Sequence, residues 1–188
     1  MSEEPIPEDF ARSWTWLGLN PETFEEEARW IETPRELGSG CGSFFEMAGK
    51  LMRCARTDHT LMSPAFFHAV IGLERALRVH YKRPDESYGS LCQGSDLPFS
   101  QLFRKAIDEG LFHDGLFAEV PAFPEFLRKS YGDLGTCGVV TLAEVIPKLR
   151  NEYFHGHFLL SSELIFIAIQ LRELADALKT SPERTLLD

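Results

Sequence analysis

Apolar side chains recur at intervals of three and four residues in several separate segments of this sequence. The clearest segment runs from Ser63 to about Lys82. Its inner side is formed by Phe67, Val70, Ile71, Leu73, Leu77 and Tyr81. This spacing places the apolar residues on one face of an α-helix. The alternation of apolar and polar residues that marks a strand is nearly absent, so the sequence predicts an all-α fold.

Further stripes of the same kind predict the other helices. Long helices are expected over about residues 44–56, 141–154 and 161–179, and a shorter one over 99–108, ended by Gly110. The last of the long helices is predicted to be amphipathic, with one apolar side. Long helices joined by shorter connections are typical of a helical bundle. The predicted architecture is therefore an up-and-down bundle of about four core helices.

Local signals predict where these helices begin. Ser63 is expected to be the N-cap of the clearest helix, with Pro64 in its first turn. Thr141 and Glu144 have the spacing of a capping box, in which two side chains bond the free N–H groups of a helix start. The glycine-rich segment 37–43 is predicted to be a flexible loop that precedes the helix at 44–56.

The N-terminal region differs from the rest of the chain in its charge. Residues 1–36 hold ten acidic and three basic side chains, a net charge of −7 within the −10 of the whole chain. The region also contains Trp14, Trp16 and Trp30, whereas disordered tails are poor in aromatic residues. A helix is expected over about residues 23–31. We therefore divide the chain into an acidic N-terminal arm (1–40), expected to dock through its tryptophans, and a helical domain (41–188).

Composition and charge disfavour several classes of protein. The formal charge of −10 argues against a protein that coats nucleic acid without specificity, because such binding requires basic residues that neutralise phosphates. The cysteines form no CxxC pair, so we expect reduced thiols and no zinc site. The N-terminus is acidic where a signal peptide would be basic, and the longest apolar stretch, Leu164 to Leu171, is too short for a bilayer. We therefore expect a cytoplasmic protein outside the membrane.

The sharpest local signal is the segment Leu149-Arg150-Asn151-Glu152-Tyr153-Phe154-His155-Gly156, at the end of a predicted helix. Arg150 and His155 are separated by about 140° around the axis of a straight helix, so they would not share a face. They converge if His155 lies beyond the helix end. They also converge if two copies of the chain meet across a two-fold axis.

Arginine and histidine together supply what RNA cleavage without a metal requires. Histidine moves a proton to or from the 2′-hydroxyl or the leaving oxygen near neutral pH. Arginine binds a phosphate and stabilises the charge that develops on it, and Asn151 would position either group. The ribose 2′-hydroxyl is the nucleophile, so no protein nucleophile is needed. In the alternative, structural interpretation, Arg150 reaches solvent and His155 caps the C-terminal carbonyls.

Other charged residues are candidates for supporting roles. Four basic residues crowd the second half of the helix that begins at Ser63: Arg75, Arg78, Lys82 and Arg83. They would either line an RNA groove or form a solvated helix face. Glu74 would either support the site or only pair with nearby Arg78. His155 and His157 are too few to make a metal site, so we expect no metal and no cofactor.

The segment Arg150-Asn151-Glu-Tyr-Phe-His155-Gly156 resembles the motif of the HEPN superfamily, in which an Arg is followed, four to six residues on, by a His. HEPN domains are small α-helical bundles that carry this motif late in the chain, just before the last long helix. The stretch from Ala69 to Arg78 is similar to the long amphipathic helix of such domains. The resemblance covers roughly residues 44–180 and leaves residues 1–40 unexplained.

The resemblance implies an RNA-directed function. HEPN proteins are commonly homodimers in which two motifs meet and form one composite site. Many are metal-independent endoribonucleases of toxin–antitoxin, phage-defence or RNA-processing systems, which would make Arg150 and His155 catalytic and Asn151 their polar neighbour. One subgroup pairs with a nucleotidyltransferase antitoxin that modifies a Tyr two residues after the His. Here His157 holds that position, which argues against such a pairing.

Other HEPN proteins have lost catalysis and serve as binding modules. The sequence therefore leaves two functions open. The first is cleavage or binding of an RNA substrate through Arg150 and His155. The second is a non-catalytic module that uses its dimer face and arm to hold a protein partner, an antitoxin or another protein.

Overall fold

The computed structural model describes residues 21–32, 41–81, 97–117, 138–155 and 163–178. All regular secondary structure in these residues is helical, which confirms the predicted all-α class. The elements in chain order are α2 (Pro21–Glu32), α3 (Cys41–Cys54), the 3₁₀ turn η1 (His59–Leu61), α4 (Met62–His80), α5 (Phe99–Asp108), the 3₁₀ turn η2 (Asp114–Phe117), α7 (Val139–Phe154) and α8 (Glu163–Ala177).

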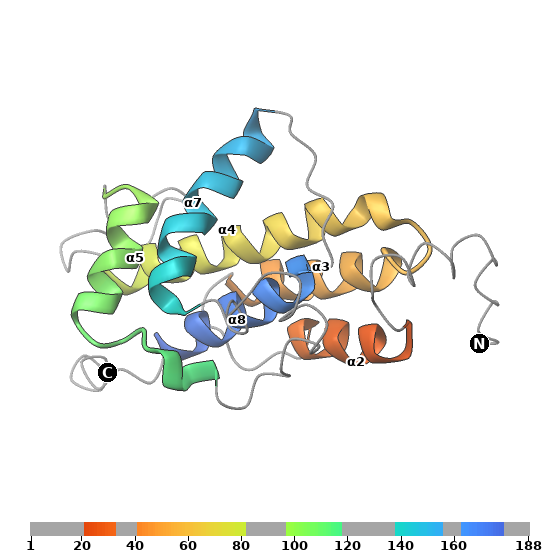
Figure 1. Cartoon of the computed structure of the whole chain (residues 1–188), viewed down its shortest axis with the longest axis horizontal. Helices are drawn as coiled ribbons and strands as arrows, with labels where there is room; N and C mark the ends of the chain where they lie inside the picture. Colours follow the sequence, from red (N-terminus) through yellow and green to blue (C-terminus); the bar gives the residue numbers. More distant parts are fainter. Residues whose placement is uncertain (1–20, 33–40, 82–96, 118–137, 156–162, 179–188) are drawn as a thin grey trace.

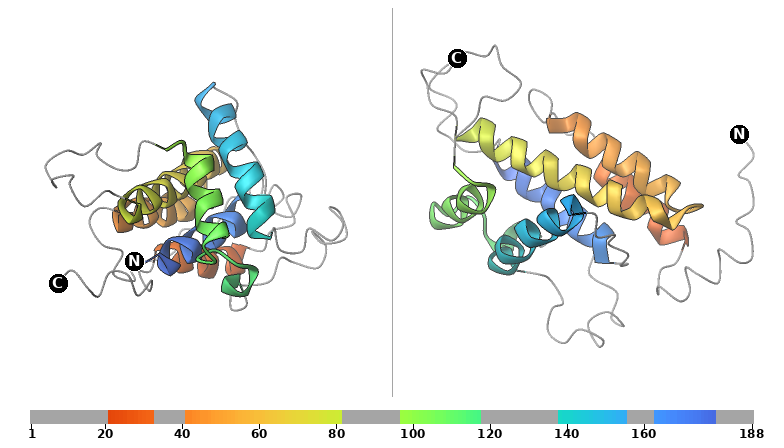
Figure 2. Two further views of the ribbon diagram at one scale, coloured as in Figure 1. Left: turned by 90° about the vertical axis from the view of Figure 1, so that its left-hand side faces the viewer. Right: turned by 90° about the horizontal axis from the view of Figure 1, so that it is seen from above.

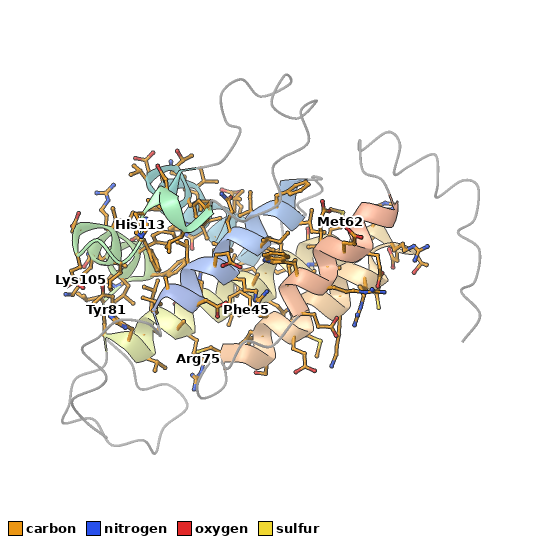
Figure 3. The ribbon with its side chains drawn as sticks, turned by 90° about the horizontal axis from the view of Figure 1, so that it is seen from below. Phe45, Met62, Arg75, Tyr81, Lys105 and His113 are labelled. Atoms are coloured by element: carbon orange, nitrogen blue, oxygen red, sulfur yellow. The ribbon has the colours of Figure 1, made fainter. Side chains whose placement is uncertain are left out.

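Helices α3 and α4 form an antiparallel pair and lie side by side along most of their length (Figures 1 and 2). Phe45 of α3 is almost fully buried and lies in the interior (Figure 3). The two helices approach closely because α4 has a glycine beside this ring. A Cβ on Gly72 would lie 2.8 Å from Cε2 of Phe45, closer than real Cβ contacts, so a larger residue there would displace the ring.

Helix α8 forms the centre of the described fold. Every residue from Leu164 to Arg172 is buried, including the polar Gln170. The helix packs against α2, α3, α4 and η2. The predicted amphipathic character of this helix is therefore wrong. The apolar side is buried as expected, but from Leu164 to Arg172 neighbouring elements cover the other sides as well, so that polar Gln170 and Arg172 are also buried.

Helix α2 lies along α3 and α8 (Figure 1). Its inner residues Ala28 and Ile31 are fully buried. Close approach to α3 requires a glycine at position 49, because a Cβ there would lie 2.5 Å from the Cβ and 2.8 Å from the backbone nitrogen of Glu32. This helix falls within the predicted N-terminal arm, and it packs as one of the core helices.

A polar cluster joins α2 to α8, and we call Trp30, Arg172, Glu173 and Asp176 the α2–α8 polar cluster. The indole Nε1 of Trp30 donates a hydrogen bond of 3.0 Å to Glu173. Arg172, which is 2% exposed, donates a hydrogen bond to the backbone carbonyl of Trp30 and lies 3.7 Å from Asp176. Trp30 thus contacts α8, while Trp14 and Trp16, through which the arm was also expected to dock, lie outside the described residues.

Helices α5 and α7 pack together on one side of the α3–α4 pair (Figure 2). The span of α5 is the predicted one, and Gly110 follows it with φ +72°, the left-handed conformation that favours glycine after a helix. Helix α7 also contacts α4, and its C-terminal end projects from the bundle (Figure 1). This projecting end carries the candidate motif.

Two predicted helix starts are wrong, because η1 leads into α4 and a distant residue caps α7. Helix α4 begins at Met62 instead of after Ser63, since η1 leads directly into it. Helix α7 begins at Val139, so the predicted N-cap Thr141 lies inside the helix. The carboxylate of Asp114, in η2, accepts a hydrogen bond of 2.8 Å from the Val139 N–H and satisfies the helix start.

The glycine-rich segment is also more ordered than predicted at its end. Helix α3 begins at Cys41, so residues 41–43 are helical where a loop was expected. Cys41 is 3% exposed and belongs to the core. Burial of this side chain favours an added helical turn over the loop that local glycine content predicts.

Candidate functional site

The segment from Arg150 to His155 forms the projecting end of α7 (Figure 1). The helix ends at Phe154, as predicted, and His155 is its C-cap residue. The His155 N–H bonds the carbonyls of Asn151 at 3.0 Å and Glu152 at 3.1 Å. His155 therefore lies just beyond the last helical residue. The side chains of Asn151 and His155 are both exposed.

Arg150 forms an ion pair with Glu74 of α4. Its Nε lies 3.1 Å from Oε2 of Glu74, and its Nη2 lies 3.5 Å from Oε1. Glu74 is buried, and its Oε1 also accepts hydrogen bonds from Nη2 of Arg78 at 2.7 Å and from Nε of Arg78 at 3.1 Å. One carboxylate thus holds two guanidinium groups. Glu74 pairs with Arg78, as the sequence had suggested, and it also contacts Arg150.

Aromatic side chains hold the end of α7 against α4. The ring of Phe67 stacks on Tyr153 with 4.4 Å between centroids, and it meets Phe154 edge to face at 4.8 Å. The guanidinium carbon of Arg150 lies 5.1 Å from the centre of the Phe154 ring, within the range of a cation–π interaction. We call Phe67, Arg150, Tyr153 and Phe154 the aromatic–arginine cluster. Phe67 is buried, whereas Phe154 is 62% exposed.

No role was predicted for Tyr153 and Phe154, although both lie inside the motif. A signal was present in their positions. Two adjacent aromatic residues at a helix end point about 100° apart, so one of them lies nearer the edge of the packed face. Phe154 also follows Arg150 by one helical turn, which brings the two side chains to the same side of the helix. The contact of both with Phe67 depends on how α7 crosses α4, which the local sequence does not specify.

The predicted RNA-binding residues are only partly brought together. Arg78 lies near Arg150 through their shared partner Glu74, and its Nη1 donates a hydrogen bond of 3.3 Å to the carbonyl of Leu97. Arg75 extends outward from α4 (Figure 3). Lys82, Arg83 and His157 lie outside the described residues.

The described part of the chain offers no cluster of three or more His, Cys, Asp or Glu side chains that would hold a metal ion. Within the same residues, no helix combines the length and the apolar character needed to cross a membrane. At the end of α7, the groups available for chemistry include a guanidinium held by a carboxylate, an exposed imidazole, an exposed amide, an exposed phenyl ring and the exposed carboxylate of Glu152.

Comparisons of this chain with protein-family models, with curated proteins and with solved structures found no match in any of the three. The resemblance to HEPN proteins therefore rests on the Arg150–His155 motif and on its place before the last long helix.

Proposed function

We propose that this protein is a HEPN-like, metal-independent endoribonuclease that binds RNA at the C-terminal end of α7, with Arg150, Asn151 and His155 in its site. The observation that carries the proposal is the placement of the motif. It ends a projecting helix, its histidine is exposed, and its arginine is held by a buried carboxylate of α4. A motif placed in this way is open to RNA and to a second copy of the chain. The proposal therefore includes a homodimer in which two motifs form one site.

The proposed reaction is an internal transesterification of RNA. The ribose 2′-oxygen attacks the adjacent phosphorus while the bond to the 5′-oxygen of the next nucleotide breaks. The products end in a 2′,3′-cyclic phosphate and a 5′-hydroxyl. His155 of one copy accepts the proton of the 2′-hydroxyl, and His155 of the other copy donates a proton to the leaving oxygen.

In the proposed site, Arg150 binds the phosphate and stabilises the negative charge on the phosphate oxygens. Glu74 is its positioning residue, because it fixes the guanidinium from the neighbouring helix. Glu74 is shared between Arg150 and Arg78, so one carboxylate faces two guanidinium groups. Asn151 is exposed one residue beyond Arg150 and would bond a phosphate or ribose oxygen.

The test is cleavage of total RNA by the purified protein in EDTA. Arg150→Ala and His155→Ala should each lower the rate at least about a hundredfold, as for loss of a charge-stabilising or proton-transferring group. Lys148→Ala, an exposed cation on α7, and His113→Ala, an exposed histidine elsewhere, are the matched controls and should retain activity. The products should carry 2′,3′-cyclic phosphate ends. Equal cleavage by the wild type and by His155→Ala would refute the proposal.

A second candidate function is a non-catalytic HEPN-like module that holds a protein partner. The observation in its favour is the ion pair between Arg150 and Glu74, which already compensates much of the charge that a phosphate would require. In this case the wild type cleaves no RNA in the same assay. Arg150→Ala would then change the thermal stability of the protein without changing any RNA-directed property.

A further inference from the structure

Phe154 is fixed in place but largely uncovered. It is 62% exposed, although a phenylalanine is stabilised by burial. Phe67 meets the ring edge to face at 4.8 Å, and the guanidinium carbon of Arg150 lies 5.1 Å from the ring centre. Phe67 is itself buried and stacked on Tyr153. The bundle thus holds one part of the ring while much of its surface remains in contact with solvent.

The surroundings of Phe154 favour a nucleic acid over a protein surface. The residues next to it on α7 are polar or charged, since Asn151, Glu152 and His155 are all exposed. Val140, the other strongly exposed apolar residue of α7, lies at the opposite end of that helix. Protein interfaces cover contiguous apolar patches. An exposed aromatic ring that lies beside an arginine and among polar side chains is instead what stacks on an unpaired nucleobase.

We infer that Phe154 is the base-stacking residue of the RNA site. An unpaired base packs on the open surface of its ring, and Arg150, one helical turn earlier, binds the phosphate beside that base. The two side chains lie on the same side of α7 and are already in contact. The inference rests on the proposed function and names the substrate class of its site. A base inside a duplex does not offer its face to a protein ring, so the site selects single-stranded RNA or loops.

The experiment measures binding to a single-stranded 2′-O-methyl RNA of about 12 nucleotides, a length that covers one site. This RNA cannot be cleaved because its nucleophile is blocked, and one central 2-aminopurine reports stacking by the loss of its fluorescence. Phe154→Ala should bind about tenfold more weakly and should lose the quenching. Phe154→Trp should retain both, and Val140→Ala is the matched control on the same helix. A duplex of the same sequence should bind the wild type and Phe154→Ala equally.

Several outcomes would overturn the inference, and they can be told apart from failure of the proposed function. Unchanged affinity and quenching in Phe154→Ala reject the stacking role, even where cleavage depends on His155. Equal weakening for single-stranded and duplex RNA rejects it too, as does loss of binding in Phe154→Trp. A wild type that neither binds nor cleaves RNA rejects both. A change from dimer to monomer in Phe154→Ala, measured by sedimentation velocity at unchanged RNA affinity, would assign the ring to an interface between copies.

Discussion

Arg172 of α8 donates a hydrogen bond to the backbone carbonyl of Trp30 in α2, which lies 142 positions earlier in the sequence. The Arg172 side chain is 2% exposed, so its charge is almost completely removed from water. A buried charge of this kind is tolerated only where partners compensate it. Here the compensation comes from the Trp30 carbonyl and from Asp176, 3.7 Å away on the next turn of α8.

Arg172→Ala should destabilise the protein by about 3–5 kcal/mol, because it leaves the partly buried Asp176 beside an empty space and the Trp30 carbonyl without this donor. Arg172→Met, which fills the same space without the charge, should cost less. Arg29→Ala is the matched control, since Arg29 is 65% exposed and pairs with Glu25 on the surface of its own helix. It should change stability by about 0.5 kcal/mol or less. Urea denaturation measures all three, and an equal loss for Arg172 and Arg29 would contradict the prediction.

The pH dependence of stability should reflect Glu27. Burial, and to a smaller extent the charge of Glu26, raises the pKa of Glu27 from 4.5 to about 7. Between these two values the folded protein holds a proton that the unfolded chain has released. The contribution of protonated Glu27 to stability is therefore complete below pH 4.5 and is lost as the pH rises to about 7.

Glu27→Gln should flatten the pH dependence of the unfolding free energy across this window. At pH values above about 7 the variant should be more stable than the wild type, by up to about 3 kcal/mol, since it carries no buried carboxylate. Glu26→Gln removes only the smaller cause, so most of the slope should persist in that control. The measurement is urea denaturation at a series of pH values. A wild-type slope that survives in Glu27→Gln would show that another group is responsible.

Gly49→Ala should destabilise the α2–α3 contact although alanine favours helices by about 1 kcal/mol over glycine. The new Cβ would lie 2.5 Å from the Cβ of Glu32 and 2.8 Å from its Cα, so α2 would have to move. We expect a net loss of about 1–3 kcal/mol, as for overpacked interiors. Lys50→Ala, at the exposed neighbouring position, should change little. An alanine at position 49 that stabilises the protein would show that α2 is free to shift.

Removal of the Asp114 carboxylate should weaken the start of α7. Asp114→Ala is expected to cost about 1 kcal/mol, the usual loss for a helix cap, while Asp114→Asn keeps an acceptor oxygen and should cost less. Gly138→Ala should have a similar effect, because its Cβ would lie 3.1 Å from the Asp114 oxygen that bonds Val139.

The double variant of Asp114→Ala and Gly138→Ala checks this coupling. The double variant should lose less stability than the sum of the two single losses, since both substitutions act through the same hydrogen bond. Hydrogen exchange of the first turn of α7 reports the cap directly, and Asp108→Ala serves as an exposed control on α5. Fully additive losses would show that the two residues affect stability independently of each other.

Local sequence patterns predicted helices well where the neighbouring residues decide the structure. The helix Phe99–Asp108 and its terminating Gly110 follow from an apolar stripe and a glycine stop, and both were predicted. The start of α7 could not be predicted in this way. Its cap is Asp114, which lies 25 positions before Val139, and only the packing of η2 beside α7 brings the two together. The complete burial of α8 likewise depends on which elements surround it.

In the candidate site, too, features set by neighbouring residues could be predicted, and features set by helix packing could not. The run of residues before Gly156 predicted that Arg150 lies near the end of a helix. It also allowed the prediction that His155 follows the last helical residue. The sequence could name Glu74 as a supporter but not choose its partner, because that choice depends on the crossing of α7 over α4. The edge-to-face contact of Phe67 and Phe154 has the same origin and was not predicted.

Helix α8 is the centre of the bundle, yet the ribosome makes it after every other described helix. Until α8 is made, α2, α3 and α4 can pack on one another, but the faces that α8 covers stay exposed to solvent or to chaperones. Folding of the core is therefore expected to be a late event that follows synthesis of α8. Chains interrupted before that point should be recognised by quality control instead of persisting as partly functional fragments.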